Sequence, residues 1–193
     1  MSQDYRKSKL IPQTWYPQKY LEYCVSLVDE KLKSGLWLEC GTATGTTAEA
    51  ISGVMPKDAM LYTFDSFEGL SESWGAHRAG SFAQDPPKLD SDRVEVVVGW
   101  FADTLPKFTQ EHKEDIAFLH VDCDLYGSTK TVLDVFGDKI VPGTIIAFDE
   151  IVGHPLMADH EYRAFMEFVK HSGKNYEYVA HIERGNQAAC RII

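Results

Sequence analysis

Residues 36–47, which read LWLECGTATGTT, contain the pattern that decides the fold. The first five of these residues are mostly apolar and predict a buried strand. Residues 44–55 predict a helix, and Gly41 and Gly45 form a GxxxG turn between the two elements. Ligands of open α/β sheets bind beyond the carboxyl ends of the strands, so we expect a binding site at this turn.

Outside this stretch, short apolar runs alternate with longer helical patterns. The predicted helices carry apolar residues three or four positions apart, with Gly35 ending the first helix and Asp159 capping the last. Strands that alternate with helices form βαβ units and a mostly parallel sheet. We predict strands at residues 36–40, 60–64, 94–98, 116–121 and 144–148, and helices at residues 20–33 and 44–55, from Ser128 onward and after Asp159.

The last part of the chain departs from this alternation. Residues 176–181 and 187–193 predict two strands joined by residues 183–186, a turn-rich link of hairpin length. A nicotinamide-binding Rossmann domain would continue with parallel βα units instead. We therefore expect an α/β fold of the Rossmann-like class I methyltransferase type. Its mostly parallel seven-stranded sheet would have helices on both faces and a C-terminal antiparallel hairpin.

We expect a single domain over residues 1–193, because this length suffices for one well-packed core but not for two. Residues 1–34 form an N-terminal extension and helix, in which residues 11–16 either cover the site or lie in a subunit interface of a homo-oligomer. Residues 66–92 contain two adjacent prolines, several glycines and little periodicity. Such a segment is typically a lid or a disordered loop, and a lid or active-site loop is favoured here by the apolar anchors Phe67, Trp74 and Phe82.

The composition argues against several classes of protein. A formal net charge of −10 repels the phosphates of nucleic acids. No apolar run of about eighteen residues predicts a membrane span, and the N-terminus lacks the apolar core of a signal peptide. The four cysteines lie far apart, which indicates reduced thiols rather than a disulfide framework or a zinc site. We therefore expect a cytoplasmic protein with a small-molecule partner and no nucleic-acid or membrane partner.

The glycine turn indicates the type of cofactor. The dinucleotide fingerprint GxGxxG uses its second glycine to approach a pyrophosphate, and Ala43 occupies that position here. S-adenosylmethionine has no pyrophosphate and does not need that glycine. Glu39 suits the cationic amino group of its methionine part, and Asp65, at the end of the next strand, suits the two ribose hydroxyls. Alternatively, Asp65 is a turn residue that accepts hydrogen bonds from the backbone just after it.

An aromatic pair follows the third predicted strand. Trp100 and Phe101 stand where an adenine ring can lie against an aromatic side chain, although packing in the core explains Trp100 nearly as well. The cofactor-binding residues expected from the pattern are Glu39, Gly41, Thr42, Gly45, Thr46, Asp65, Trp100, Phe101 and Asp122.

Acidic residues follow the fourth and fifth predicted strands. Neighbouring strand ends of a parallel sheet lie close together, so we expect Asp122, Asp149 and Glu150 to converge. Converging carboxylates repel one another, and a divalent cation such as Mg²⁺ neutralises them. The cation would lower the pKa of an attacking hydroxyl and orient it towards the sulfonium methyl group. We interpret Asp124 as a solvated residue or a local cap.

Histidines are the other candidates for a catalytic base. His77, in the irregular segment, and His154, just past the fifth strand, are free to reach a substrate. Together with Asp122, they are the expected catalytic residues. His120 lies inside an apolar strand, where a histidine is usually a hydrogen-bonded core residue.

Four motifs resemble the macrocin O-methyltransferase family: FDSFEGL (64–70), GWFADTLP (99–106), HVDCDLYGST (120–129) and PGTIIAFDE (142–150). Members of this family methylate sugar hydroxyls of macrolides and related natural products. The resemblance covers residues 35–187 and is most specific in residues 122–129, which read DCDLYGST. It implies that S-adenosylmethionine binds at Glu39, Gly41, Asp65 and Ser66, and that Mg²⁺ binds to three acids at Asp122, Asp149 and Glu150.

The chain departs from the family pattern in two places. The family usually has two aspartates after the fifth strand, whereas this chain has Asp149 followed by Glu150, whose longer side chain alters the metal site. Residues 66–92 are short beside the family's insertion, and His77 is the counterpart of its catalytic histidine. The acceptor is therefore open: a macrolide sugar, a glycan sugar or another hydroxylated small molecule.

The leading hypothesis is a metal-assisted, S-adenosylmethionine-dependent O-methyltransferase that acts on a hydroxyl of a small molecule or sugar. One alternative is a metal-independent methyltransferase with His77 or His154 as the base. Another is a non-catalytic S-adenosylmethionine-binding protein. A nicotinamide-dependent oxidoreductase is disfavoured by Ala43 and by the terminal hairpin.

Overall fold

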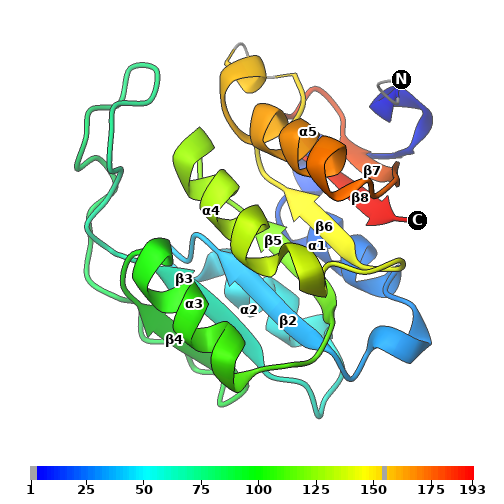
Figure 1. Ribbon diagram of the computed structural model, residues 1–193, viewed down its shortest axis with the longest axis horizontal. Helices are drawn as coiled ribbons and strands as arrows, with labels where there is room; N and C mark the ends of the chain where they lie inside the picture. The colour runs from blue at the N-terminus through cyan, green and yellow to red at the C-terminus, as the bar shows by residue number, and fades with distance from the viewer. Residues whose placement is uncertain (1–3, 154–155) are drawn as a thin grey trace.

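The computed structural model describes residues 4–153 and 156–193. In this part of the chain, one sheet of 8 strands lies between two layers of helices (Figure 1). None of these helices has the length and apolar character that a membrane span requires. The strands are β1 (Lys9–Ile11), β2 (Leu36–Cys40), β3 (Leu61–Asp65), β4 (Val94–Val98), β5 (Ile116–Val121), β6 (Ile145–Phe148), β7 (Tyr176–Ile182) and β8 (Ala188–Ile192). The helices are α1 (Gln18–Ser26), α2 (Thr46–Val54), α3 (Phe101–Glu111), α4 (Tyr126–Phe136) and α5 (Glu161–Ser172), with short 3-10 turns at Tyr5–Lys7, Gln13–Trp15, Glu30–Leu32, Gly137–Lys139 and Met157–Asp159.

The strands follow the order β1-β7-β8-β6-β5-β2-β3-β4 across the sheet. Strand β8 runs antiparallel to β6 and β7, and the other neighbouring strands are parallel. The mostly parallel sheet with a C-terminal antiparallel hairpin is therefore confirmed. The sheet has one strand more than the seven expected, because Lys9–Ile11 adds β1 beside β7. Only Ile11 of this three-residue strand is buried. The strand is therefore too short to show an alternation of apolar and polar residues in the sequence.

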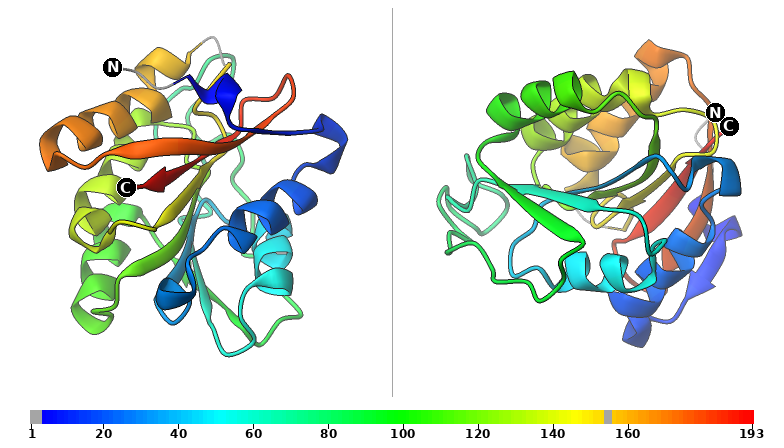
Figure 2. Two further views of the ribbon diagram at one scale, coloured as in Figure 1. Left: turned by 90° about the vertical axis from the view of Figure 1, so that its right-hand side faces the viewer. Right: turned by 90° about the horizontal axis from the view of Figure 1, so that it is seen from below.

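Two apolar cores fill the space between the sheet and its helices. Helices α3, α4 and α5 pack on one face of the sheet, and α1 and α2 pack on the other (Figure 2). All of β5 is buried, as expected for a central parallel strand covered on both faces. Its residues alternate between the cores: Leu119 and Val121 face α3–α5, and Phe118 faces α1 and α2. His120 and Asp122 continue the row of Phe118, so this alternation places them on the α1 and α2 side.

Helix α3 is an element that the sequence patterns did not predict. It begins at Phe101 and packs Leu105 and Phe108 into the core beneath it. Pro106 lies inside this helix, and a proline usually ends a helix because it has no N–H to donate and clashes with the preceding turn. Burial of the apolar face outweighs that penalty here.

The prediction that Asp159 caps the last helix was wrong. Helix α5 begins at Glu161, and His160 at its N-cap position makes no side-chain capping hydrogen bond. Asp159 instead ends the preceding 3-10 turn, so the helix starts later than the capping pattern indicated.

Residues 66–92 join β3 to β4 and extend away from the sheet as an irregular loop (Figure 1). An isolated bridge joins Trp74 to His77, and their rings stack with centroids 5.6 Å apart. The ring of Phe82 lies 4.8 Å from that of His77. The irregularity was expected, and three aromatic rings hold the loop together. That it acts as a lid stays a prediction.

Candidate active site

The turn after β2 approaches the turn after β5 so closely that only glycine fits. Gly41 has a φ of +102°, and a Cβ atom there would lie 1.8 Å from the carbonyl oxygen of Asp122. The N–H of Asp122 donates to the carbonyl oxygen of Cys40, and the N–H of Gly41 donates to that of Phe64, each at 2.9 Å. These bonds hold the carboxyl ends of β2, β3 and β5 together.

Asp65 holds the glycine turn in place. Its carboxylate accepts hydrogen bonds from the backbone N–H groups of Thr42 and Ala43, both at 3.0 Å, and from that of Phe67 at 2.8 Å. Of the two roles considered for Asp65, the structure shows the turn residue. Asp65 also lines the cavity described next, where it could contact a ligand. Its contact with a ribose stays a prediction.

A cavity of about 510 Å³ lies at the carboxyl ends of the central strands, which is a usual size for a small-molecule site. Backbone and small side chains of the glycine turn line one part of it, and carboxyl groups line another. No lysine or arginine belongs to the lining in the described part of the chain. The lining includes Gly41, Ala43, Thr44, Asp65, Ser66, Trp74, Phe82, Trp100, Phe101, Asp122, Asp124 and Glu150.

The predicted site residues divide into two groups. Those that line the cavity are Gly41, Asp65, Ser66, Trp100, Phe101, Asp122 and Glu150. Those that the lining does not include are Glu39, Thr42, Gly45, Thr46, His77 and Asp149. Thr42 is buried with its hydroxyl 2.6 Å from that of Thr63, and Gly45 is the N-cap of α2 with a φ of +82°. His154 lies outside the described residues.

Glu39 is engaged inside the sheet rather than exposed to a ligand. Its side chain is 0% exposed, with Oε1 3.0 Å from Nδ1 of His120. Its Oε2 accepts a hydrogen bond from the hydroxyl of Thr63 at 2.7 Å. Contact between Glu39 and the amino group of methionine stays a prediction. Glu39 belongs to β2, and its neighbours in the sheet are Thr63 of β3 and His120 of β5.

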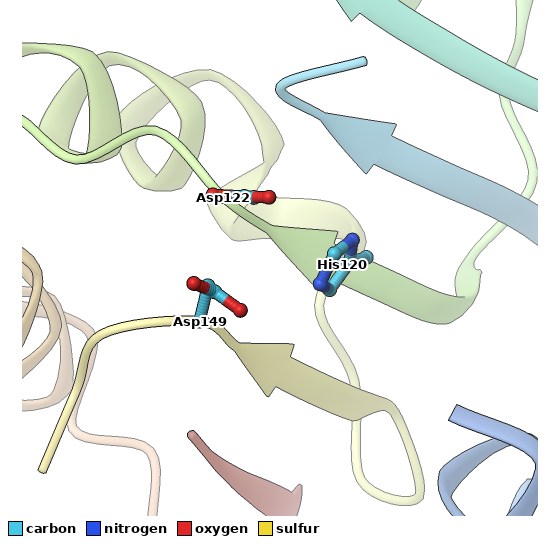
Figure 3. Close-up of side chains that lie close together, drawn as sticks. All are labelled: His120, Asp122 and Asp149. Atoms are coloured by element: carbon cyan, nitrogen blue, oxygen red, sulfur yellow. The ribbon is translucent and has the colours of Figure 1, made fainter. Parts of the chain in front are cut away.

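A histidine and two carboxylates meet where β5 and β6 end (Figure 3). One ring nitrogen of His120 and one carboxylate oxygen each of Asp122 and Asp149 lie within 4.8 Å of one another. Burial, followed by the charge of Asp149, raises the pKa of Asp122 well above its usual value. The two aspartates lie together, as their positions at adjacent strand ends indicated. His120 joins them, although the sequence suggested an ordinary core residue.

Asp124 and Glu150 bring two more carboxyl groups to the cavity. Burial, followed by the charge of Asp149, raises the pKa of Asp124 to about 6. Burial, followed by the charge of Asp124, raises the pKa of Glu150 to about 8, and its Oε2 is buried without a hydrogen-bond partner among the described residues. Asp124 was expected to be solvated or to cap the backbone, and it is instead a partly buried cavity residue with a φ of +59°.

Glu161 connects the two acidic turns, and no sequence pattern singled it out. It is fully buried in the first turn of α5, where it accepts hydrogen bonds from the N–H of Cys123 at 3.2 Å and of Glu150 at 3.0 Å. Burial raises the pKa of its carboxyl group. The sequence shows only that Glu161 is an acidic residue in the first turn of a helix, which is a common position. Its role could not be predicted, because Cys123 and Glu150 lie in other parts of the chain.

The N-terminal segment reaches the acidic end of the site through Tyr16. The hydroxyl of Tyr16 donates a hydrogen bond to Oδ1 of Asp149, and Nε2 of Gln187 donates to the same oxygen at 3.2 Å. Burial, followed by the charge of Asp149, raises the pKa of Tyr16. Residues 11–16 therefore include a residue that contacts Asp149, whereas covering of the site and a subunit interface stay predictions.

Comparisons with known proteins agree with this geometry. Residues 38–151 match a family described as a methyltransferase domain. A relative among characterised proteins is mycinamicin III 3''-O-methyltransferase from Micromonospora griseorubida, which is 25% identical over 170 residues. The match includes 74% of this chain and 66% of that enzyme, so the chain spans just under two thirds of the relative's length.

Solved structures share the fold. The O-methyltransferase NovP is similar with a TM-score of 0.70 at 23% identity, over 90% of this chain and 78% of NovP. MycE, a methyltransferase of the mycinamycin biosynthetic pathway, was solved in complex with Mg, S-adenosylhomocysteine and mycinamycin VI. It is similar with a TM-score of 0.60 at 12% identity, over 92% of this chain and 49% of MycE.

Proposed function

Since the chain belongs to the methyltransferase domain family, we propose that it transfers the methyl group of S-adenosylmethionine to a hydroxyl of a sugar or other small molecule, assisted by a divalent cation. One observation carries the proposal. The cavity that begins at the glycine turn and Asp65 ends at the carboxyl groups of Asp122, Asp124 and Glu150. A cofactor and an acceptor can therefore meet in it. Methyl transfer requires chiefly such alignment, because the cofactor supplies the electrophile.

The glycine turn and its neighbours would hold the cofactor. Gly41 and Ala43 offer close backbone approach, and Asp65 keeps lone pairs for the ribose beyond the three N–H groups it already accepts. Ser66 and the aromatic pair Trp100 and Phe101 line the same cavity and would border the adenosine.

The acidic residues fit a divalent cation. Asp122 and Asp149 lie close together, and burial and neighbouring acids raise the pKa of Asp122. One oxygen of Glu150 is buried and has no hydrogen-bond partner among the described residues. Carboxylate oxygens are the ligands that Mg²⁺ prefers, so Asp122, Asp149 and Glu150 would hold it. When bound, the cation lowers the pKa of the acceptor hydroxyl. The Mg in the MycE complex supports this choice.

Asp124 is the residue best placed to take the proton from the acceptor hydroxyl. It lines the cavity beside Asp122, where its carboxylate can accept the proton of a hydroxyl. His77 lies near enough for its charge to lower the pKa of Asp124. His77 would therefore act on Asp124 or the acceptor from the lid.

The lining favours an uncharged acceptor. Carboxyl groups without a lysine or arginine in the described lining would repel phosphate or carboxylate groups, whereas hydroxyls can donate to them. Mycinamicin III 3''-O-methyltransferase supports a sugar hydroxyl as the methylated group. The net charge of −10 disfavours a nucleic-acid partner.

Calorimetry with S-adenosylhomocysteine, with and without Mg²⁺, tests the proposal. We expect one site per chain, followed by transfer of label from methyl-labelled S-adenosylmethionine to members of a panel of glycosides, sugar diols and phenols. Absence of S-adenosylhomocysteine binding in both conditions would refute the cofactor assignment. Transfer that survives exhaustive chelation and is lost in His77→Ala would favour the metal-independent route instead.

A further inference from the structure

His120 is completely buried, yet only one of its two ring nitrogens has a partner. Nδ1 lies 3.0 Å from Oε1 of Glu39, and both side chains are 0% exposed. Nε2 is buried and has no hydrogen-bond partner among the described residues. A buried ring nitrogen without a partner is costly, because it has lost its hydrogen bonds to water.

The hydrogen bonds around Glu39 determine which nitrogen carries the proton. Oε2 of Glu39 accepts from the hydroxyl of Thr63 at 2.7 Å, and that hydroxyl lies 2.6 Å from the hydroxyl of Thr42. A carboxylate can only accept, so Nδ1 of His120 donates its hydrogen to Glu39. In the neutral ring this leaves the lone pair on Nε2.

The unpartnered nitrogen lies beside the acidic end of the site. A ring nitrogen of His120 and carboxylate oxygens of Asp122 and Asp149 lie within 4.8 Å of one another, and Figure 3 shows the three side chains gathered at the ends of β5 and β6. With Nδ1 engaged by Glu39, Nε2 is the nitrogen available to this cluster. A cation placed among these groups would give the lone pair of Nε2 and the two carboxylates a common partner.

We propose that Nε2 of His120 is a direct ligand of the divalent cation, together with Asp122 and Asp149, and that Glu39 is the positioning residue that orients the ring. The inference rests on the proposed metal-assisted function. Metal-bound histidines commonly donate their other N–H to a carboxylate in this way.

A nitrogen ligand changes which cation the site prefers. Mg²⁺ favours sites made of oxygen, whereas imidazole suits first-row transition metals. The mixed set of His120, Asp122 and Asp149 therefore prefers Mn²⁺ to Mg²⁺, although the acids alone fit Mg²⁺. The competing account is that His120 carries protons on both nitrogens and serves as an internal counterion to the acids, without binding a metal.

Electron spin-echo envelope modulation of the Mn²⁺-loaded full chain distinguishes these accounts without measuring activity. We expect ¹⁴N modulation from a directly bound imidazole in the wild type and its loss in His120→Asn. The exposed His171 at the end of α5 provides the matched control, so His171→Asn should retain the modulation.

Calorimetry completes the test. We expect the wild type to bind Mn²⁺ at least about tenfold more tightly than Mg²⁺, and Glu39→Gln to weaken Mn²⁺ binding about tenfold. Mn²⁺ binding without ¹⁴N modulation in the wild type overturns the inference and leaves the metal-assisted function standing. If Mn²⁺ and Mg²⁺ both fail to bind while S-adenosylhomocysteine binds, the inference and metal assistance fail together, and the cofactor assignment survives. The wild-type spectrum decides even if a variant does not fold.

Discussion

Asp65→Asn should destabilise the protein even when no cofactor is present. Asp65 accepts two N–H groups of the glycine turn through Oδ2 and a third, from Phe67, through Oδ1. Asparagine keeps one acceptor oxygen and places an NH₂ group where the other was. If the oxygen of asparagine accepts from the N–H of Phe67, its NH₂ group faces the N–H groups of Thr42 and Ala43. Both groups are donors, so the two hydrogen bonds to the glycine turn are lost.

The magnitude follows from the two bonds lost. A hydrogen bond to a charged group contributes about 1.5–3 kcal/mol, and this carboxylate is partly exposed, so the lower end applies. Two such bonds give a loss of about 3 kcal/mol in the free energy of unfolding. We further expect the affinity for S-adenosylhomocysteine to fall at least about tenfold, because the turn that would hold it loosens.

Urea unfolding at pH 7 without cofactor or metal measures the first quantity, and calorimetry measures the second. Asp58→Asn, at an exposed turn position, provides a matched control and should unfold like the wild type. If Asp65→Asn loses cofactor affinity but stays within about 0.5 kcal/mol of the wild type in unfolding, the anchoring argument is refuted. Asp65 would then act through the ligand alone.

Three further predictions concern the acidic end of the site. Asp124→Asn should lower kcat at least about 100-fold and leave S-adenosylhomocysteine affinity within about threefold; equal losses in steady-state rate and calorimetric affinity would contradict a role as base. Tyr16→Phe removes the hydrogen bond to Asp149 and should lower the free energy of urea unfolding by about 1.5 kcal/mol, whereas an unchanged midpoint would mean that the bond contributes nothing. Asp124 and Glu150 have pKa values raised by folding to about 6 and about 8, so the folded protein holds protons that the unfolded chain releases. The metal-free protein should therefore lose stability as the pH rises from about 4 to about 8, seen as a falling Tm that saturating Mn²⁺ opposes, and a Tm that rises over this range would exclude the acids as the cause.

Three strands could be predicted because their sequences are mostly apolar. The predicted bounds of β2, β4 and β5 agree with the structure, since each run ends at a glycine or an acidic residue. Two other elements depended on tertiary contacts. β1 exists because β7 offers it a partner, and α3 tolerates Pro106 because its apolar face is buried.

The candidate site could be predicted where topology alone places a residue. Asp65 is the last residue of β3, Gly41 and Asp122 directly follow β2 and β5, and parallel strands bring those ends together. The roles of Glu39 and His120 depend on register, because only the pairing of β2 with β5 sets the two side chains beside each other. No local pattern contains that information.

Strand β1 has a consequence for how the protein is made. It precedes the other described strands in the sequence, and its Lys9 pairs with Ala180 of β7, so β1 has no partner until β7 has been synthesised. Contacts between residues so far apart in sequence form late. The pairs of β2 with β3 and β5, which position the glycine turn, Asp65 and Asp122, can therefore form in a nascent chain before β1 joins the sheet.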